Sequence, residues 1–186
     1  MKKFIVHTKD TAPEKSVAVL EGAEKTFGFI PNLMGTMAES PATAEGYLTL
    51  SRIFDQTAFS RTERQVIILA ASRYNECHYC MAAHSMVAEM QKVPQEVTEA
   101  IRNDRPITDP KLEALRQFTT RMVDKRGWVS DEERQAFVDA GYSRQQILEV
   151  ILGVTYKTLS NYVNHNADTP VDAAFAAKTW SPPTAR

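Results

Sequence analysis

Glycine, cysteine and long apolar runs are all scarce in this chain of 186 residues. Its seven glycines form no Asn-Gly or Asp-Gly pair, the dipeptides that most strongly indicate a β-hairpin. No segment alternates polar and apolar residues clearly enough to predict a strand. These absences argue against a β-rich fold, and the sequence predicts an all-α protein.

An excess of charge of one sign is also missing, because 22 Lys and Arg stand against 23 Asp and Glu. Nucleic acid and anionic membrane surfaces are bound through basic patches, so neither is expected as a partner. No stretch approaches the ~20 apolar residues of a membrane span. The apolar residues 4–6 are too few for a signal peptide, and we expect a cytoplasmic protein.

Apolar residues at helical spacing predict a single all-helical domain over residues 1–186, with an extended arm at 1–13. A tail at 167–186 is expected to wrap a neighbour or fray. The helices at 61–74 and 143–166 are apolar around most of their circumference, so they should pack together, with burial continuing across a subunit interface. The predicted helices cover residues 14–26, a short segment after 31, 40–55, 61–74, 77 to about 93, 95–102, 109–127, 130–141 and 143–166.

The two cysteines provide the clearest chemical signal. Cys77 and Cys80 are three residues apart, and His84 follows one helical turn after the second cysteine. On a helix all three side chains share one face. A helix N-terminus and a nearby imidazole both favour the thiolate, so the pattern predicts a redox-active dithiol with Cys80, Cys77 and His84 as catalytic residues.

Two other interpretations of these residues remain open. Zinc could use two thiolates and an imidazole, but a structural zinc site needs four ligands and no second Cys or His pair follows at the usual spacing. Alternatively, the thiols are buried as small apolar groups beside a core histidine. We expect neither a metal nor a cofactor.

The surroundings of this motif resemble a known family. Residues 75–84, Asn-Glu-Cys-His-Tyr-Cys-Met-Ala-Ala-His, follow a capping box and a buried helix, as in the alkylhydroperoxidase (AhpD-like) branch of the carboxymuconolactone decarboxylase superfamily. Residues 27–33, the pair Ser40-Pro41 and the stretch 161–172 are similar to the longer, peroxidase-related members. The resemblance covers most of residues 15–180.

The resemblance implies a subunit with a central buried helix followed by the CxxC-bearing helix, assembled as a homo-oligomer (dimer, trimer or hexamer). It also implies cofactor-free reduction of hydroperoxides. Cys80 would attack the peroxide oxygen and become a sulfenic acid, and Cys77 would resolve it as a disulfide. A dithiol reductant would then reopen the disulfide.

The chain departs from this family at its proton relay. Well-studied members have a glutamate twelve residues before the first cysteine and a histidine directly before the second. Those positions are Gln65 and Tyr79 here. Glutamine cannot carry a proton, and a tyrosine with a pKa of about 10 is a poor base at neutral pH, so the relay is broken.

Three further residues are candidates for a replacement relay: Glu63, Glu76 and His165. Each also has a structural explanation. Glu63 completes a capping box with Ser60, Glu76 is a carboxylate favoured at a helix start, and His165 lies at a helix C-terminus, where histidine binds free carbonyls.

The predicted function is therefore a thiol peroxidase or dithiol oxidoreductase, with a weak preference for organic hydroperoxides. A decarboxylase-like enzyme is an alternative, although it needs no cysteines and the motif helix offers no Lys or Arg to bind a carboxylate. A non-catalytic helical oligomer, acting as a redox sensor or structural protein, is the other alternative.

Overall fold

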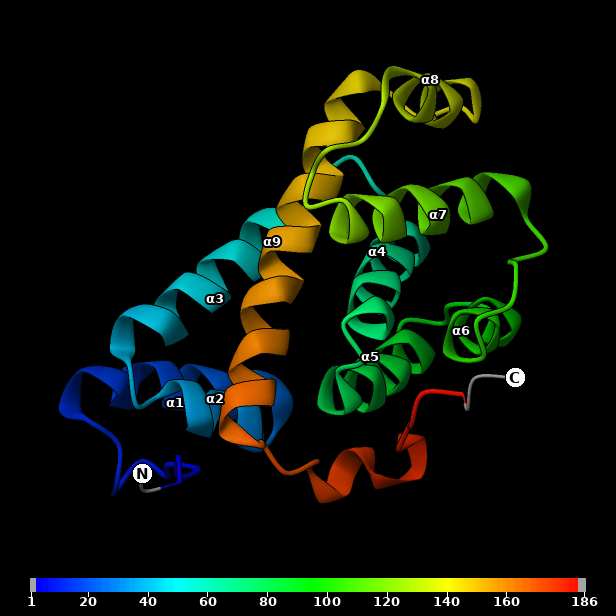
Figure 1. Ribbon diagram of the computed structural model, residues 1–186. Helices are drawn as coiled ribbons and strands as arrows, with labels where there is room; N and C mark the ends of the chain where they lie inside the picture. Colours follow the sequence, from blue (N-terminus) through cyan, green and yellow to red (C-terminus); the bar gives the residue numbers. More distant parts are fainter. Residues whose placement is uncertain (1–2, 184–186) are drawn as a thin grey trace.

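The chain folds into helices that surround one central helix, as the computed structural model shows (Figure 1). The structure describes residues 3–183, and no strand occurs among them, which confirms the all-α prediction. Residues 1–2 of the predicted arm and 184–186 of the predicted tail lie outside this range. The elements are α1 (Glu14–Phe27), α2 (Asn32–Met37), α3 (Pro41–Phe54), α4 (Arg61–Tyr74), α5 (His78–Met90), α6 (Gln95–Arg102), α7 (Pro110–Asp124), α8 (Asp131–Asp139), α9 (Arg144–Ala167) and the short 3-10 helix η1 (Ala173–Lys178).

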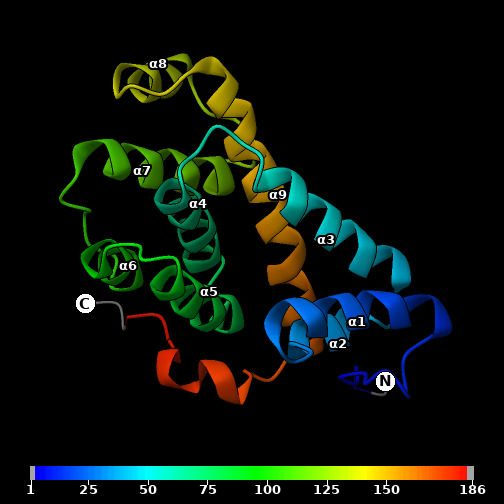
Figure 2. The same cartoon turned by 180° about the vertical axis from the view of Figure 1, so that it is seen from behind.

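Helix α4 lies at the centre. Every residue from Gln65 to Ser72 is buried, and the helix packs against α5, α6, α7 and α9 (Figure 2). Its start is fixed by the predicted capping box, in which the Ser60 hydroxyl accepts a hydrogen bond from the Glu63 amide and the Glu63 carboxylate accepts one from the Ser60 amide. Capping boxes that begin at Ser130 and Ser143 fix the starts of α8 and α9 in the same way.

The long helix α9 crosses the molecule and contacts α2, α3, α4, α5 and α7 (Figure 1). Gly153 allows this close packing, because a Cβ there would lie 2.7 Å from both Ile67 Cγ2 and a carbon of the Phe54 ring. The predicted packing of α9 on α4 is confirmed, whereas the burial expected across a subunit interface stays a prediction. Leu148 and Ile151 are 67% and 41% exposed, and the buried face of its second half is polar.

The C-terminal residues do not fray within the described part of the chain. Residues 168–183, here called the C-terminal strap, run along α5, with η1 packed on that helix (Figure 2). The Trp180 indole donates a hydrogen bond to the Arg102 carbonyl, and Asp172 accepts hydrogen bonds from the Tyr79 hydroxyl and the Asn32 amide. The expected tail is therefore part of the molecule's own packing.

Within residues 3–183, no helix combines the length and the apolar character needed to cross a membrane.

Candidate active site

The two cysteines lie at the start of α5. Glu76 has φ 54°, which turns the chain sharply after α4, and Cys77 is the N-cap residue of α5. Cys80 follows in the first turn, where free backbone N–H groups and the helix dipole favour a negative charge. Both are free thiols and both are buried.

Helix α9 places three polar groups around Cys80. The Cys80 sulfur lies 3.3 Å from the Asn164 side-chain nitrogen and 3.6 Å from Lys157 Nζ, which both donate to it, and 3.6 Å from the Ser160 hydroxyl. The Asn164 nitrogen also lies 3.7 Å from the sulfur of Cys77. These contacts stabilise a thiolate at Cys80.

The two thiols differ in acidity. Burial alone would raise the pKa of Cys80, but the hydrogen bond from Cys77, the charge of Lys157 and the Ser160 hydroxyl together hold it well below the usual value. The pKa of Cys77 is raised, first because its thiol donates to Cys80 and then because it is buried. Cys80 is therefore the more acidic thiol of the pair, and Cys77 is the thiol that donates to it.

Lys157 is completely buried and links Cys80 to His84. Its ammonium lies 3.0 Å from His84 Nε2. Burial, and then the charge of Lys157, lower the pKa of His84 well below its usual value, so the imidazole is neutral. Because an ammonium only donates hydrogen bonds, Nε2 must accept and Nδ1 must carry the ring proton. The direct Cys80–His84 pair expected from the sequence is thus replaced by a Cys80–Lys157–His84 chain.

A cavity of about 850 Å³ opens beside Cys80. Its walls come from α1 to α5, α9 and Phe175 of the C-terminal strap, and Cys80, Lys157 and His84 all line it. Gln65 and His84 each keep one buried polar atom, Oε1 and Nδ1, without a hydrogen-bond partner among the described residues. A bound molecule with polar groups can satisfy them. The apolar part of the lining includes Leu33, Met34, Tyr47, Leu48, Phe54, Ile68, Val87 and Tyr156.

The two altered relay positions both line this cavity but have taken other partners. Gln65 donates to the side chain of Gln91. The Tyr79 hydroxyl donates to Asp172 at 2.6 Å, and burial together with this hydrogen bond raises its pKa. Tyr79 therefore ties the C-terminal strap to α5, and it has no free proton-accepting role.

The other relay candidates lie outside the residues that line the cavity. Glu63 completes its capping box and Glu76 is exposed in the turn before α5. His165 is exposed beside Tyr162 on the last turns of α9. His78, next to Cys77, is exposed and bonds the Trp180 carbonyl. The structure brings none of these side chains to Cys80.

The zinc interpretation does not fit this geometry. Within residues 3–183 no three His, Cys, Asp or Glu side chains are grouped as ligands. The Lys157 ammonium also bonds both Cys80 and His84, and a metal ion shared by those two residues would have to displace it.

The sequence alone does not predict Lys157, Ser160 and Asn164 as site residues, because polar residues in a helix suggest a solvent-facing side. A weak signal was present. Lys157 and Asn164 continue the spacing of three and four residues set by Val150 and Gly153, which predicts one shared face. Lys157 also removes one argument against a decarboxylase, since α9 supplies the missing cation.

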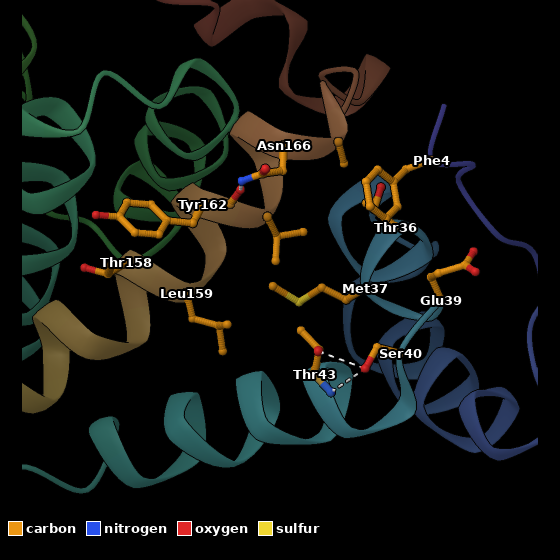
Figure 3. A pocket seen from close by; sticks show the side chains of 12 residues that line it. Phe4, Thr36, Met37, Glu39, Ser40, Thr43, Thr158, Leu159, Tyr162 and Asn166 are labelled. Carbon is orange, nitrogen blue, oxygen red and sulfur yellow. Dashed lines mark hydrogen bonds between the residues drawn. The ribbon is translucent and has the colours of Figure 1, made fainter. Parts of the chain in front are cut away.

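A second pocket, of about 360 Å³, lies between α2, α3, α9 and Phe4 of the N-terminal arm (Figure 3). Its lining is mostly apolar, with Met37 and Leu159 among the side chains around the hollow. Its one carboxylate, Glu39, is bonded by His7 at 2.8 Å. With neither cysteine nor lysine in its walls, this pocket offers none of the chemistry found at Cys80.

Comparison with known proteins identifies a family model that matches part of the chain. Residues 41–121 match the model of the carboxymuconolactone decarboxylase family. No protein with a curated description matches the sequence significantly.

Solved structures share the fold over nearly the whole chain. The alkylhydroperoxidase AhpD core, an uncharacterized peroxidase-related protein from Ralstonia eutropha JMP134, has 19% identity and a TM-score of 0.81 over 97% of each chain. A peroxidase-related protein from Silicibacter sp. TM1040 has 15% identity and a TM-score of 0.79 over 95% of each chain. The debrominase Bmp8, as its C82A variant with 2,3,4-tribromopyrrole, has 20% identity and a TM-score of 0.78 over 96% of each chain.

Proposed function

We propose that this chain, which belongs to the carboxymuconolactone decarboxylase superfamily and has its AhpD-like fold, reduces organic hydroperoxides with Cys80 and Cys77. One observation carries the proposal. Cys80 lies in the wall of a cavity large enough for an organic molecule, and Lys157 Nζ and the Asn164 side-chain nitrogen lie 3.6 and 3.3 Å from its sulfur. A structural pair of buried thiols has no need of either feature.

The proposed reaction has two steps on the protein. The Cys80 thiolate attacks the terminal oxygen of the hydroperoxide, the O–O bond breaks, and Cys80 becomes a sulfenic acid while an alcohol leaves after protonation. The Cys77 thiol then attacks the Cys80 sulfur, forming the disulfide and releasing water. A dithiol reductant restores both thiols, which requires a reducing compartment, and we propose the cytoplasm.

The cavity supports an organic substrate over hydrogen peroxide. Pockets of roughly 300–1,000 Å³ hold drug-sized molecules, and this one offers many apolar and aromatic side chains. Hydrogen peroxide would leave most of that surface without contacts. The unpartnered Gln65 and His84 atoms can bond the polar end of a larger substrate.

Reductive dehalogenation is a second candidate, favoured by the aromatic wall formed by Tyr47 and the stacked Tyr156. A debrominase of the same fold has been captured with a brominated pyrrole. Here the Cys80 thiolate would take a bromine from an aromatic carbon, which gains a proton. The Cys77 thiol would then displace bromide, leaving the same disulfide.

One assay tests both candidates. Reduced protein is mixed with cumene hydroperoxide or with 2,3,4-tribromopyrrole, and intact mass, thiol content and free bromide are followed. We expect the hydroperoxide to convert both thiols to a disulfide. The Cys77→Ser variant should stop at a sulfenic acid that dimedone traps, and Cys80→Ser should not react.

Bromide release without hydroperoxide consumption would establish the second candidate instead. If neither compound reacts faster with the protein than with free cysteine, both candidates fail, and a sensor or structural oligomer becomes the better description.

A further inference from the structure

The relay positions of the family cannot supply a proton here, because Gln65 has no acidic group and the Tyr79 hydroxyl is bonded to Asp172. The reaction still needs one. Breaking an O–O bond leaves an alkoxide, a strong base and a poor leaving group, so a positioned acid should accelerate this step. A charged donor beside the sulfur would supply this proton.

Lys157 is placed to be this proton donor. Its ammonium lies 3.6 Å from the Cys80 sulfur, lines the same cavity and is fully buried. No carboxylate pairs with it among residues 3–183. A buried ammonium is stable only beside an opposite charge, and the Cys80 thiolate is the anion within reach.

His84 fixes the direction of the ammonium. Its neutral Nε2 accepts one of the three N–H groups at 3.0 Å, which leaves others for the sulfur and for the cavity. The Tyr156 ring lies 5.0 Å from Nζ and adds a further attraction for the cation. An oxygen bound at the sulfur would therefore lie next to an N–H donor.

We propose that Lys157 is a catalytic residue that protonates the departing alkoxide, in place of the family's relay. This rests on the proposed peroxidase function. Atoms and charge balance in this step. The Cys80 thiolate, the hydroperoxide and the Lys157 ammonium give a sulfenic acid, an alcohol and a neutral amine. When the dithiol reductant opens the disulfide, it releases Cys77 as a thiol and Cys80 as a thiolate, and the remaining proton returns to Lys157.

The test compares two oxidants of similar size. tert-Butyl hydroperoxide releases an alkoxide that needs the proton, whereas peracetic acid releases acetate, which does not. In the Cys77→Ser background, the rate of Cys80 oxidation is measured with each oxidant, and the ratio of the two rates is taken. The fraction of thiolate cancels in this ratio, so a change in thiol acidity alone cannot move it.

We expect Lys157→Met to lower the ratio of hydroperoxide rate to peracid rate by about 100-fold, as for loss of a general acid. Methionine is flexible and of similar length, so the core should accept it. Lys157→Arg keeps the charge with a weaker acid and should lower the ratio less, which provides a second test if the methionine variant does not fold. The exposed Lys15→Met is the matched control and should leave the ratio unchanged.

A ratio within about threefold of the wild-type ratio in the folded Lys157 variants would overturn the inference, because general acids typically contribute about 10²–10⁴-fold. The proposed function can then still stand, since wild-type protein would be reducing the hydroperoxide. If wild-type protein reacts with neither oxidant faster than free cysteine does, the proposed function fails, and the proton transfer with it.

Discussion

At the scale of single residues, the site depends on charge placed next to sulfur. Lys157, on α9, and the first turn of α5 both favour a thiolate at Cys80, while the Cys77 thiol donates to it. The two cysteines are chemically distinct for this reason. His84, one turn away along α5, contacts the ammonium rather than the sulfur and carries no charge of its own.

We therefore predict different consequences for two substitutions. The alkylation rate of Cys80 by iodoacetamide, in the Cys77→Ser background, should be constant around neutral pH and fall only as acid protonates the thiolate, because the pKa of Cys80 is lowered. His84→Leu should move this profile only slightly, whereas Lys157→Met should move its midpoint upward towards about 8.5, that of a free cysteine. A shift with His84→Leu as large as that with Lys157→Met would contradict the assigned arrangement.

At the scale of elements, α9 decides what the site contains. Its approach to α3 and α4 at Gly153 sets how closely its second half lies against the start of α5. With a larger residue there, the helix would have to move away from Ile67 and Phe54. The donors around Cys80 would move with it.

Gly153→Val should accordingly lower the free energy of unfolding by about 1–3 kcal/mol, the usual cost of overpacking a core. It should also slow Cys80 oxidation. Gly46→Ala is the matched control: it lies within α3 with nothing within 4 Å of the added Cβ, so it should stabilise the protein by about 0.4–1 kcal/mol. Urea denaturation measures the free energy of unfolding of both variants. Equal values for the two would show that α9 can shift at little cost.

At the scale of the whole molecule, the C-terminal strap completes the cavity. Phe175 forms part of the wall, and Asp172 joins the strap to α2 and α5 through the Asn32 amide and the Tyr79 hydroxyl. Segments about 140 residues apart in the chain thus close one side of the site. We therefore expect the position of the strap to limit the size of the molecules that reach Cys80.

We expect Asp172→Ala to lower the free energy of unfolding by about 1–3 kcal/mol, because it leaves a buried hydroxyl and amide without their acceptor. Bulky maleimides should then modify Cys80 faster than in wild type. Glu89→Ala, which removes the exposed ion pair to Lys178 of the strap, should change stability by less than about 1 kcal/mol. Unchanged maleimide rates in Asp172→Ala would show that the strap does not limit access.

The sequence alone determined the helices and the location of the thiols. Capping boxes and apolar periodicity are local signals, because each depends on residues within a few positions of one another. They predicted α4 as the buried centre, α5 beginning at Cys77 and the all-helical fold. The CxxC pair was equally readable, since its two cysteines share one turn.

Only the tertiary structure decided which groups surround Cys80. Lys157 comes from a helix more than 70 residues away in the chain, and its burial contradicts what its polarity predicts in isolation. A buried ammonium is stable only beside a partner such as the thiolate, and that partner exists only when α9 packs on α5. The position of the C-terminal strap also depends on tertiary structure, because Asp172 meets the Asn32 amide and the Tyr79 hydroxyl only in the folded molecule.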